Sequence, residues 1–432
     1  TRPMSSGVYA IPNIECRTTS VVTNTTPIVA YRGAGRPEAT AAIERAMDLF
    51  ALEIGKDAAE VRRMNLIPKF LEPHTTVVGQ TYDVGDYETA LDKALDAADY
   101  KALRAEQAKR RASGDAKQLG IGVSVYVEIT GGVGNGESAK VEVLEDGRAV
   151  VYTGTSPHGQ GHDTAWSMLV QEQTGIPMDR IELVWGDTDL VPVGTGTMGS
   201  RSLQQGGNAV FQVAGTLAEK AKSVAARLLE VSEADVVLDK DRGAFHVVGT
   251  PAVTKTWADL AVAEKSTGGL LHDEVINVSG ATFPFGAHIA VVEVDTETGR
   301  VKHLRQVACD DAGKVLNPML LDGQIHGGIA QGVAQALLEE VLYDADGNPT
   351  TSNLADYGFI SAAELPNVEV IHMETPTPVN AIGAKGIGES GTIGSTPAIQ
   401  SAVVDAVSHL GVKHIEMPCT AERVWRAIQA AQ

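Results

Sequence analysis

Cysteine is scarce in this chain of 432 residues, which contains only Cys16, Cys309 and Cys419. The three lie far apart and form no C-x-x-C pair, which argues against a disulfide framework or a cluster-binding module. We therefore expect a protein of the reducing cytoplasm. The first residues show neither an initiating Met nor a basic segment followed by an apolar one, so we expect Thr1 to begin a truncated or excised chain.

Long apolar runs and an excess of positive charge are also missing. No stretch approaches the roughly 20 apolar residues of a membrane helix, so we expect a soluble protein with no membrane partner. The formal net charge of −20 at pH 7 repels phosphate backbones, which argues against nucleic acid as a partner. The chain is long enough for two or three packed units.

Apolar patterns of period 2 and period 3.6 follow each other along the whole chain. This mixture predicts an α+β fold of mixed sheets with flanking helices. Pro37 suits the first turn of a helix, in which Ala42, Ala46, Phe50 and Leu52 form an apolar stripe.

A second helix is expected after Asp86, which suits the N-cap position. Its pattern dissolves in the charged segment from Glu106 to Asp115. We therefore predict a linker at 106–118, between a first block at 1–105 and a second at 119–432.

The second block opens with alternating apolar residues from Ile121 to Val127. Together with 139–144 and 150–153, they predict an antiparallel meander. Later apolar patterns alternate between strands and helices and indicate one continuous αβ unit. Helices are expected from about Gly161 and near 204–229, 325–342 and 397–410, and further strands near 181–185, 245–248, 288–294 and 301–308.

Four Gly-rich segments carry the candidate chemistry. The first, at 30–38, places Arg32 and Arg36 around a turn before a helix, and spacing alone favours a helix entry with solvated arginines. The second is H-G-Q-G-H-D at 158–163. Its histidines suggest a metal site, but glycines lie between them and no cysteine is near, so polar contacts to a cofactor suit it better.

The third segment, at 194–202, sets many small donors before a helix. It matches an anion cradle but lacks the G-K-[ST] of a nucleotide triphosphate site. The fourth, at 383–391, places Glu389 among glycines. A desolvated carboxylate there could act as a general base, and a loop carboxylate that caps the next helix fits the spacing equally well.

Two further segments suggest other ligands only superficially. The paired aspartates at 310–311 lack the spacing of an EF-hand calcium loop. The glycines at 131–136 lack the strand-to-helix context of a dinucleotide fingerprint, and we interpret them as a flexible β connection.

Five motifs in order resemble the large, molybdopterin-binding subunit of molybdenum hydroxylases, the family of xanthine oxidase. They are A-Y-R-G-A-G-R-P-E-A, H-G-Q-G-H-D-T, G-T-M-G-S-R-S, N-P-M-L-L-D-G-Q-I-H-G-G-I-A-Q-G and G-A-K-G-I-G-E-S-G. The resemblance spans about Val22 to Trp425 and points to the C-terminal part of that subunit. It implies that 1–105 is the remainder of a first molybdopterin-binding domain and that 119–432 is the second.

The resemblance also implies the ligands of the site. Molybdenum is held by the dithiolene of molybdopterin and not by protein ligands, so we expect no metal-ligating residues. A cytosine dinucleotide form of the cofactor is implied by analogy. The residues that match cofactor contacts are Gly159, Gln160, Gly199, Ser200, Arg201, Gln324, Lys385, Gly386, Ile387 and Gly388.

The implied activity is oxidative hydroxylation of an aldehyde or an N-heterocycle, with water as the oxygen source. Glu389 matches the family's general base. Arg32 matches a substrate-facing arginine that stabilises developing negative charge, and Tyr31 is a further pocket candidate.

Two departures from the family leave alternatives open. Carbon monoxide dehydrogenases carry Cys-Ser-Phe after Tyr-Arg and bind copper there, whereas this chain has Gly33-Ala34-Gly35. A carbon monoxide dehydrogenase-like paralogue of unknown substrate, or a non-catalytic cofactor-binding scaffold, remains a competing reading. The family's N-terminal half is absent. We therefore expect partners: that missing half, an iron-sulfur subunit and a flavin (FAD) subunit, in a complex that dimerises.

Overall fold

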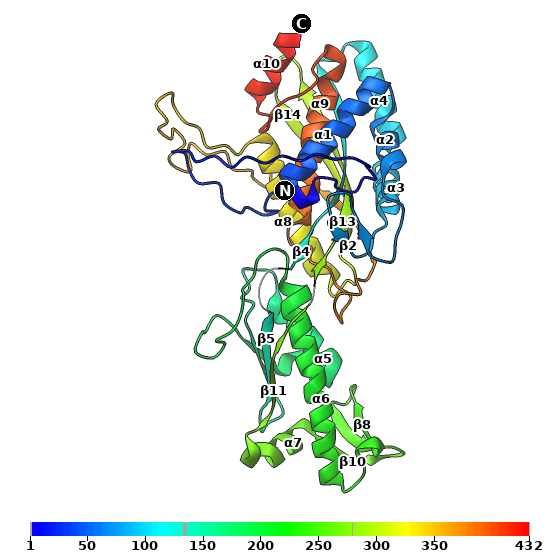
Figure 1. Cartoon of the computed structure of the whole chain (residues 1–432), viewed down its shortest axis with the longest axis vertical. Helices are drawn as coiled ribbons and strands as arrows, with labels where there is room; N and C mark the ends of the chain where they lie inside the picture. The colour runs from blue at the N-terminus through cyan, green and yellow to red at the C-terminus, as the bar shows by residue number, and fades with distance from the viewer. Residues whose placement is uncertain (1, 133–135, 279, 432) are drawn as a thin grey trace.

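The computed structural model describes residues 2–132, 136–278 and 280–431, and these form two bodies (Figure 1). The terminal body consists of residues 2–130 and 281–431 and carries both chain ends. The inserted body consists of residues 136–278 and forms the elongated green part of the figure. A two-stranded pairing of β4 (Thr130–Gly131) with β12 (Ala281–Thr282) lies where the chain passes between them.

A four-stranded mixed sheet is the centre of the terminal body, in the order β15-β14-β13-β3. The central strand β13 is antiparallel to both neighbours, and Ile289 lies opposite Val123 and Val307. Strand β15 runs parallel to β14. The bounds are β3 Lys117–Val127, β13 Phe285–Asp295, β14 Val301–Asp311 and β15 Val368–Met373. A small pair, β1 (His74–Thr75) and β2 (Thr81–Tyr82), lies outside this sheet.

Both faces of this sheet are covered, as the alternation of β13 requires. Ile289 and Val291 pack into a core shared with the first helices, and Ala290 and Val292 into a core shared with the last ones. The first set comprises α1 (Arg36–Ile54), α2 (Ala58–Asn65) and α3 (Tyr87–Ala98), with α4 (Tyr100–Ser113) beside β3. The second comprises α8 (Pro318–Leu337), α9 (Ser390–Val407) and α10 (Ala421–Ala431).

Glycines let α9 approach its neighbours at backbone distance. A Cβ on Gly122 would lie 1.9 Å from the carbonyl oxygen of Ala398, and one on Gly391 would lie 2.5 Å from that of Ile325. The predicted helix at 397–410 therefore begins earlier, at Ser390, because the glycines before Pro397 serve close packing and do not form a loop.

The inserted body packs helices against two sheets. One sheet has the order β11-β5-β6-β7 and the other β10-β9-β8. The strands are β5 Glu137–Val143, β6 Ala149–Thr153, β7 Ile181–Val184, β8 Val236–Asp239, β9 Ala244–Val247, β10 Thr250–Thr256 and β11 Leu270–Ile276. The helices are α5 (His162–Thr174), α6 (Asn208–Leu229) and α7 (Trp257–Glu264).

The α+β class with mixed sheets and flanking helices is confirmed, and two predictions about its parts are wrong. The segment predicted as a linker at 106–118 is the second half of α4 and the start of β3. Its charged side chains form ion pairs within the fold, since Arg110 pairs with Glu106 and with Glu293. The predicted meander also fails, because β3 pairs with β13 and only β5 and β6 form a hairpin.

The glycine segment at 131–136 lies partly outside the described residues. Residues 133–135 of this segment are the ones outside the described residues, and its first residue, Gly131, takes part in β4. No described helix is long and apolar enough to cross a membrane.

Candidate functional site

A cavity of about 700 Å³ lies between the two bodies and is lined by segments of both. Its volume lies in the range of ligand pockets, about 300–1,000 Å³. The terminal body contributes 30–36, 312–331 and 385–389, and the inserted body contributes 158–166 and 197–203. The cavity gathers these predicted site residues: Tyr31, Arg32, Gln160, Gly199, Ser200, Arg201, Gln324, Lys385, Gly386, Ile387, Gly388 and Glu389.

Gly159 is the predicted cofactor contact that lies outside this lining. It is exposed, and its φ of 99° is one that favours glycine. It therefore turns the chain between His158 and Gln160, both of which line the cavity.

Two Gly-rich loops meet at the cavity in direct backbone contact. A Cβ on Gly386 would lie 1.8 Å from the carbonyl oxygen of Ser200. Ser200 itself adopts a left-handed conformation, with φ 53°. The third and fourth predicted segments, which lie almost 190 residues apart, can therefore meet only because residue 386 is a glycine.

Glu389 lies at the N-terminus of α9 and is 9% exposed. Its two oxygens have separate donors: the backbone N–H of Gly33 donates to Oε1 at 2.9 Å, and the Ser200 hydroxyl lies 2.7 Å from Oε2. Its side chain makes no cap bond to the helix, so the capping alternative lacks its hydrogen bond. The Gly33 N–H and the Ser200 hydroxyl thus hold the Glu389 carboxyl group in place at the wall of the cavity.

Arg32 connects α8 to the loop before α9. Its Nε donates to the carbonyl oxygen of Gly388, Nη1 donates to Gln331 Oε1 at 3.0 Å, and Nη2 donates to the carbonyl oxygen of Gln324 at 3.0 Å. The guanidinium is therefore a fixed wall of the cavity. Tyr31 also lines it and is 45% exposed.

Two predicted cofactor contacts have side chains that are already paired. Arg201 is 1% exposed and forms an ion pair with Glu137, and the ammonium of Lys385 forms an ion pair with Asp311. Lys385 can thus offer the cavity only its main chain and its methylenes, while Arg201 keeps an Nε without a partner in the structure.

The cavity suits an anionic ligand that is rich in acceptors. Its cationic lining residues are Arg32, Arg36 and Lys314, together with the paired Arg201 and Lys385, and Glu389 supplies the carboxylate. Helices α1, α5 and α9 begin at its wall, where the positive end of each helix dipole favours negative charge. The buried Nε1 of Trp166 is a further donor beside the cavity with no partner in the structure.

Glu128 is a functional candidate that the sequence analysis missed. It is fully buried, and hydroxyls of Ser200 and Ser390 lie 2.9 and 2.6 Å from its oxygens. A signal existed in the strand before it, where Gly120 and Gly122 alternate with the apolar residues. Small residues at even positions indicate a closely packed second face, and Glu128 continues that face.

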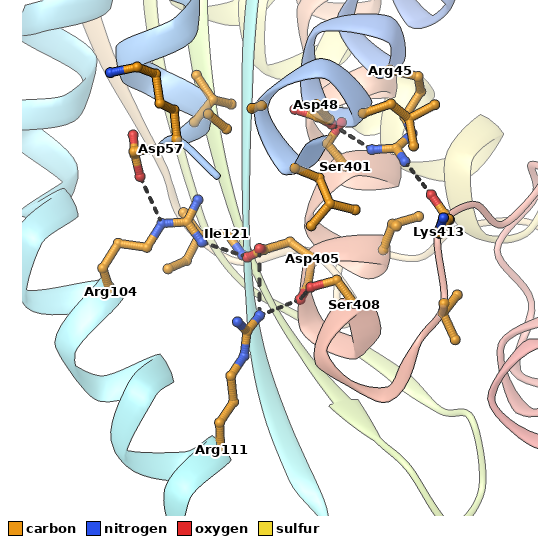
Figure 2. Close-up of a pocket in the computed structure, with 18 residues that line it drawn as sticks. Arg45, Asp48, Asp57, Arg104, Arg111, Ile121, Ser401, Asp405, Ser408 and Lys413 are labelled. Atoms are coloured by element: carbon orange, nitrogen blue, oxygen red, sulfur yellow. Dashed lines mark hydrogen bonds and ion pairs between the residues drawn. The ribbon is translucent and has the colours of Figure 1, made fainter. Parts of the chain in front are cut away.

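A smaller cavity of about 290 Å³ lies between α1, α4 and α9 (Figure 2). Figure 2 shows Arg104 and Arg111 turned toward Asp405, and Arg45 turned toward Asp48. Asp405 accepts from Arg104 at 2.8 Å and lies 3.6 Å from Arg111, while Arg45 pairs with Asp48. The pairs of Asp405 join α4 to α9, whereas Arg45 and Asp48 both belong to α1. The predicted site residues all lie elsewhere.

Comparison with known proteins identifies the family of this chain. Family profiles described as the molybdopterin cofactor-binding domain match residues 2–66 and 93–366. The chain therefore belongs to the molybdopterin-binding large-subunit family of molybdenum hydroxylases, a family of oxidoreductases.

Three similar proteins illustrate this family. The carbon monoxide dehydrogenase large chain of Hydrogenophaga pseudoflava is 41% identical over 98% of this chain and 55% of its own length. The structure of carbon monoxide dehydrogenase from Oligotropha carboxidovorans superposes with a TM-score of 0.90 at 34% identity, over 100% of this chain and 56% of that one. Quinoline 2-oxidoreductase from Pseudomonas putida 86 also gives 0.90 at 34% identity, over 99% and 56%. The chain thus spans about half the length of these relatives.

Proposed function

We propose that this chain forms the cofactor-binding part of a molybdenum hydroxylase that oxidises an aldehyde or an N-heterocycle with oxygen taken from water. The observation that carries the proposal is Glu389, a carboxylate at the wall of a cationic cavity with a donor on each of its oxygens. In that position Glu389 can accept a proton from a group in the cavity.

The cavity fits molybdopterin. The two joined loops at 199–200 and 385–388, the helix N-termini and the unpaired donors of Trp166 and Arg201 suit its phosphate and its pterin edges. Gln160 and Gln324 offer side-chain amides, and Gly199, Gly386, Ile387 and Gly388 offer main-chain groups. The bound cofactor would supply the two-electron redox chemistry.

The other residues orient Glu389 and stabilise charge on the substrate. Arg32 is held by acceptors from two segments, so its positive charge stays fixed beside Glu389 and can stabilise negative charge that develops on a substrate. The Gly33 N–H fixes Oε1 and leaves a lone pair of the carboxylate for the proton. Tyr31 bounds the substrate space.

A carbon monoxide dehydrogenase-like paralogue is the second candidate, since two of the similar proteins above carry that name. Against carbon monoxide as the substrate, the described residues that line the cavity include no cysteine. The loop after Arg32 has Gly33 instead, and a Cβ there would lie 2.5 Å from Pro37.

The assembly follows the same proposal. We infer that the rest of the pocket comes from the N-terminal half of the large subunit. Electrons would leave through an iron-sulfur subunit and a flavin subunit, and the cofactor would be the cytosine dinucleotide form. Unpaired Cys16, Cys309 and Cys419 suit the reducing cytoplasm.

The decisive experiment is Glu389→Gln in the full-length assembled complex. Loss of a general base should lower kcat by about 10²–10⁴-fold, with molybdenum and pterin contents unchanged. The exposed Glu422→Gln on α10 is the control. Full activity of the Glu389 variant would disprove its role as base, and absence of molybdenum and pterin from the native complex would disprove the enzyme.

A further inference from the structure

The Ser200 hydroxyl lies between two carboxyl groups. Its Oγ is 2.7 Å from Glu389 Oε2 and 2.9 Å from Glu128 Oε1. The Ser390 hydroxyl donates to the other oxygen of Glu128, at 2.6 Å. Glu128 follows β3, and a chain of hydrogen bonds thus runs from the buried interior to the base in the cavity.

The number of available hydrogens limits how Glu128 and Glu389 can be protonated. The two short contacts of Ser200 Oγ require two hydrogens, and its hydroxyl has only one. The second hydrogen must therefore sit on one of the carboxyl groups. If both carboxyls were ionised, one of the contacts would set two acceptor oxygens against each other.

The surroundings assign that hydrogen to Glu128. Glu128 is 0% exposed, whereas Glu389 borders the cavity and receives the Gly33 N–H and the dipole of α9. Burial raises the pKa of Glu128 well above its usual value, and the negative charge of Glu389 raises it further.

Two cations and a phenol complete the surroundings of Glu128. The charge of Arg36 opposes this rise in the pKa of Glu128 but does not reverse it. Arg32 interacts with both glutamates. Tyr126 donates to Asp310 at 2.7 Å and is not a donor to Glu128.

We propose that Glu128 is a neutral positioning residue for the base: its carboxylic acid donates to Ser200 Oγ and so turns the Ser200 O–H toward Glu389. The inference rests on the proposed function of Glu389. The Ser200 hydrogen then favours the ionised base, because donors to a carboxylate stabilise its charged form. No proton needs to leave Glu128 during the reaction.

The first test reads the proton directly, in the assembled complex with no substrate. The infrared difference spectrum at neutral pH, wild type minus Glu128→Gln, should show the carbonyl stretch of a buried carboxylic acid. Asp405→Asn is the control, because that carboxylate is held by the Arg104 guanidinium and its loss should leave the band in place. Absence of this band from the difference spectrum of wild type minus Glu128→Gln would overturn the proposal.

The second test reads the base through the acid limb of kcat/KM, normalised to molybdenum content. Glu128→Gln retains a donor toward Ser200, so this limb should move by no more than about 0.3 pH unit, whereas removal of an ionised neighbour would lower it by about 1 unit or more. Ser200→Ala should raise the limb by about 0.5–1 unit because the base loses a donor. A lowered limb in the first variant or an unmoved one in the second would contradict the proposal.

The two proposals can fail separately. Full turnover of Glu389→Gln would remove the base, while the infrared band of Glu128 does not depend on turnover. Conversely, an ionised Glu128 would leave the role of Glu389 intact.

Discussion

Lys385 and Asp311 form an ion pair that solvent does not reach, with Nζ 2.9 Å from Oδ1 and both side chains 0% exposed. The ammonium also donates to Thr375 Oγ1 at 2.9 Å and lies over the Phe285 ring. This pair fastens the loop that carries Glu389 to the end of β14. The side chain of Lys385, which the family resemblance assigned to the cofactor, thus connects two segments of the protein.

The pair should be costly to break on one side only. Lys385→Met leaves a buried carboxyl without its cation and should lower the free energy of unfolding by about 3–5 kcal/mol, measured by urea denaturation of the chain. The double variant Lys385→Met with Asp311→Asn should recover part of this loss. The exposed Lys314→Met is the control, and an equal effect of Lys314 and Lys385 would contradict the prediction.

Gly386 should tolerate no side chain. Gly386→Ala would force the loop away from the Ser200 carbonyl, 1.8 Å from the new Cβ, so molybdenum content of the assembled complex should fall strongly. Gly388→Ala is the matched comparison, because its nearest atom lies at 3.4 Å. Its loss should be clearly smaller, and equal loading of the two variants would show that the contact between the loops is dispensable.

Arg32→Lys should impair catalysis more than cofactor loading. A lysine cannot serve the acceptors of Gly388, Gln324 and Gln331 together. The loss of one hydrogen bond to a charged group is worth about 1.5–3 kcal/mol, so kcat/KM should fall by about 10–100-fold. Steady-state kinetics with molybdenum quantified in parallel measures this, and a change confined to metal content would argue for a purely structural arginine.

His303 should make the fold sensitive to acid. Burial lowers its pKa to about 4, and its Nδ1 has no partner in the structure. The unfolded chain binds this proton near pH 6.5. Between that pH and 4 the unfolded state binds more protons, so stability falls as pH falls, by about 2 kcal/mol from pH 7 to pH 5.

His303→Gln should flatten this dependence in urea denaturation at the two pH values. His272→Gln, at a partly exposed position on β11, should keep the wild-type slope. Equal slopes in wild type and His303→Gln would exclude His303 as the cause.

Sequence patterns predicted local features better than contacts between residues far apart in the sequence. The N-cap at Asp86 is confirmed, and the Gly-rich segments do meet at one cavity. In α1, however, the predicted stripe is exposed, with Phe50 at 49% and Leu52 at 55%. The buried face instead carries Glu44, whose charge is compensated by its ion pair with Arg62.

The same reason explains the missed linker and the missed Glu128. Charged residues of 106–115 look solvated in sequence, yet Arg110 and Arg111 find partners on β13 and α9, far along the chain. Glu128 becomes recognisable as a site residue only through its hydrogen bonds with Ser200 and Ser390. Tertiary pairing of this kind leaves no local periodicity to detect.

The inserted body is continuous in sequence, whereas the terminal body pairs Val127 with Phe285. During synthesis from the N-terminus, residues 136–278 emerge and can fold before β13 exists, since domains generally fold as units. The wall bearing Gln160 and Ser200 can therefore take shape before the wall bearing Glu389 is made. A ligand that contacts both walls can then be bound only after the segment at 385–389 has been made, so its binding follows the folding of the inserted body.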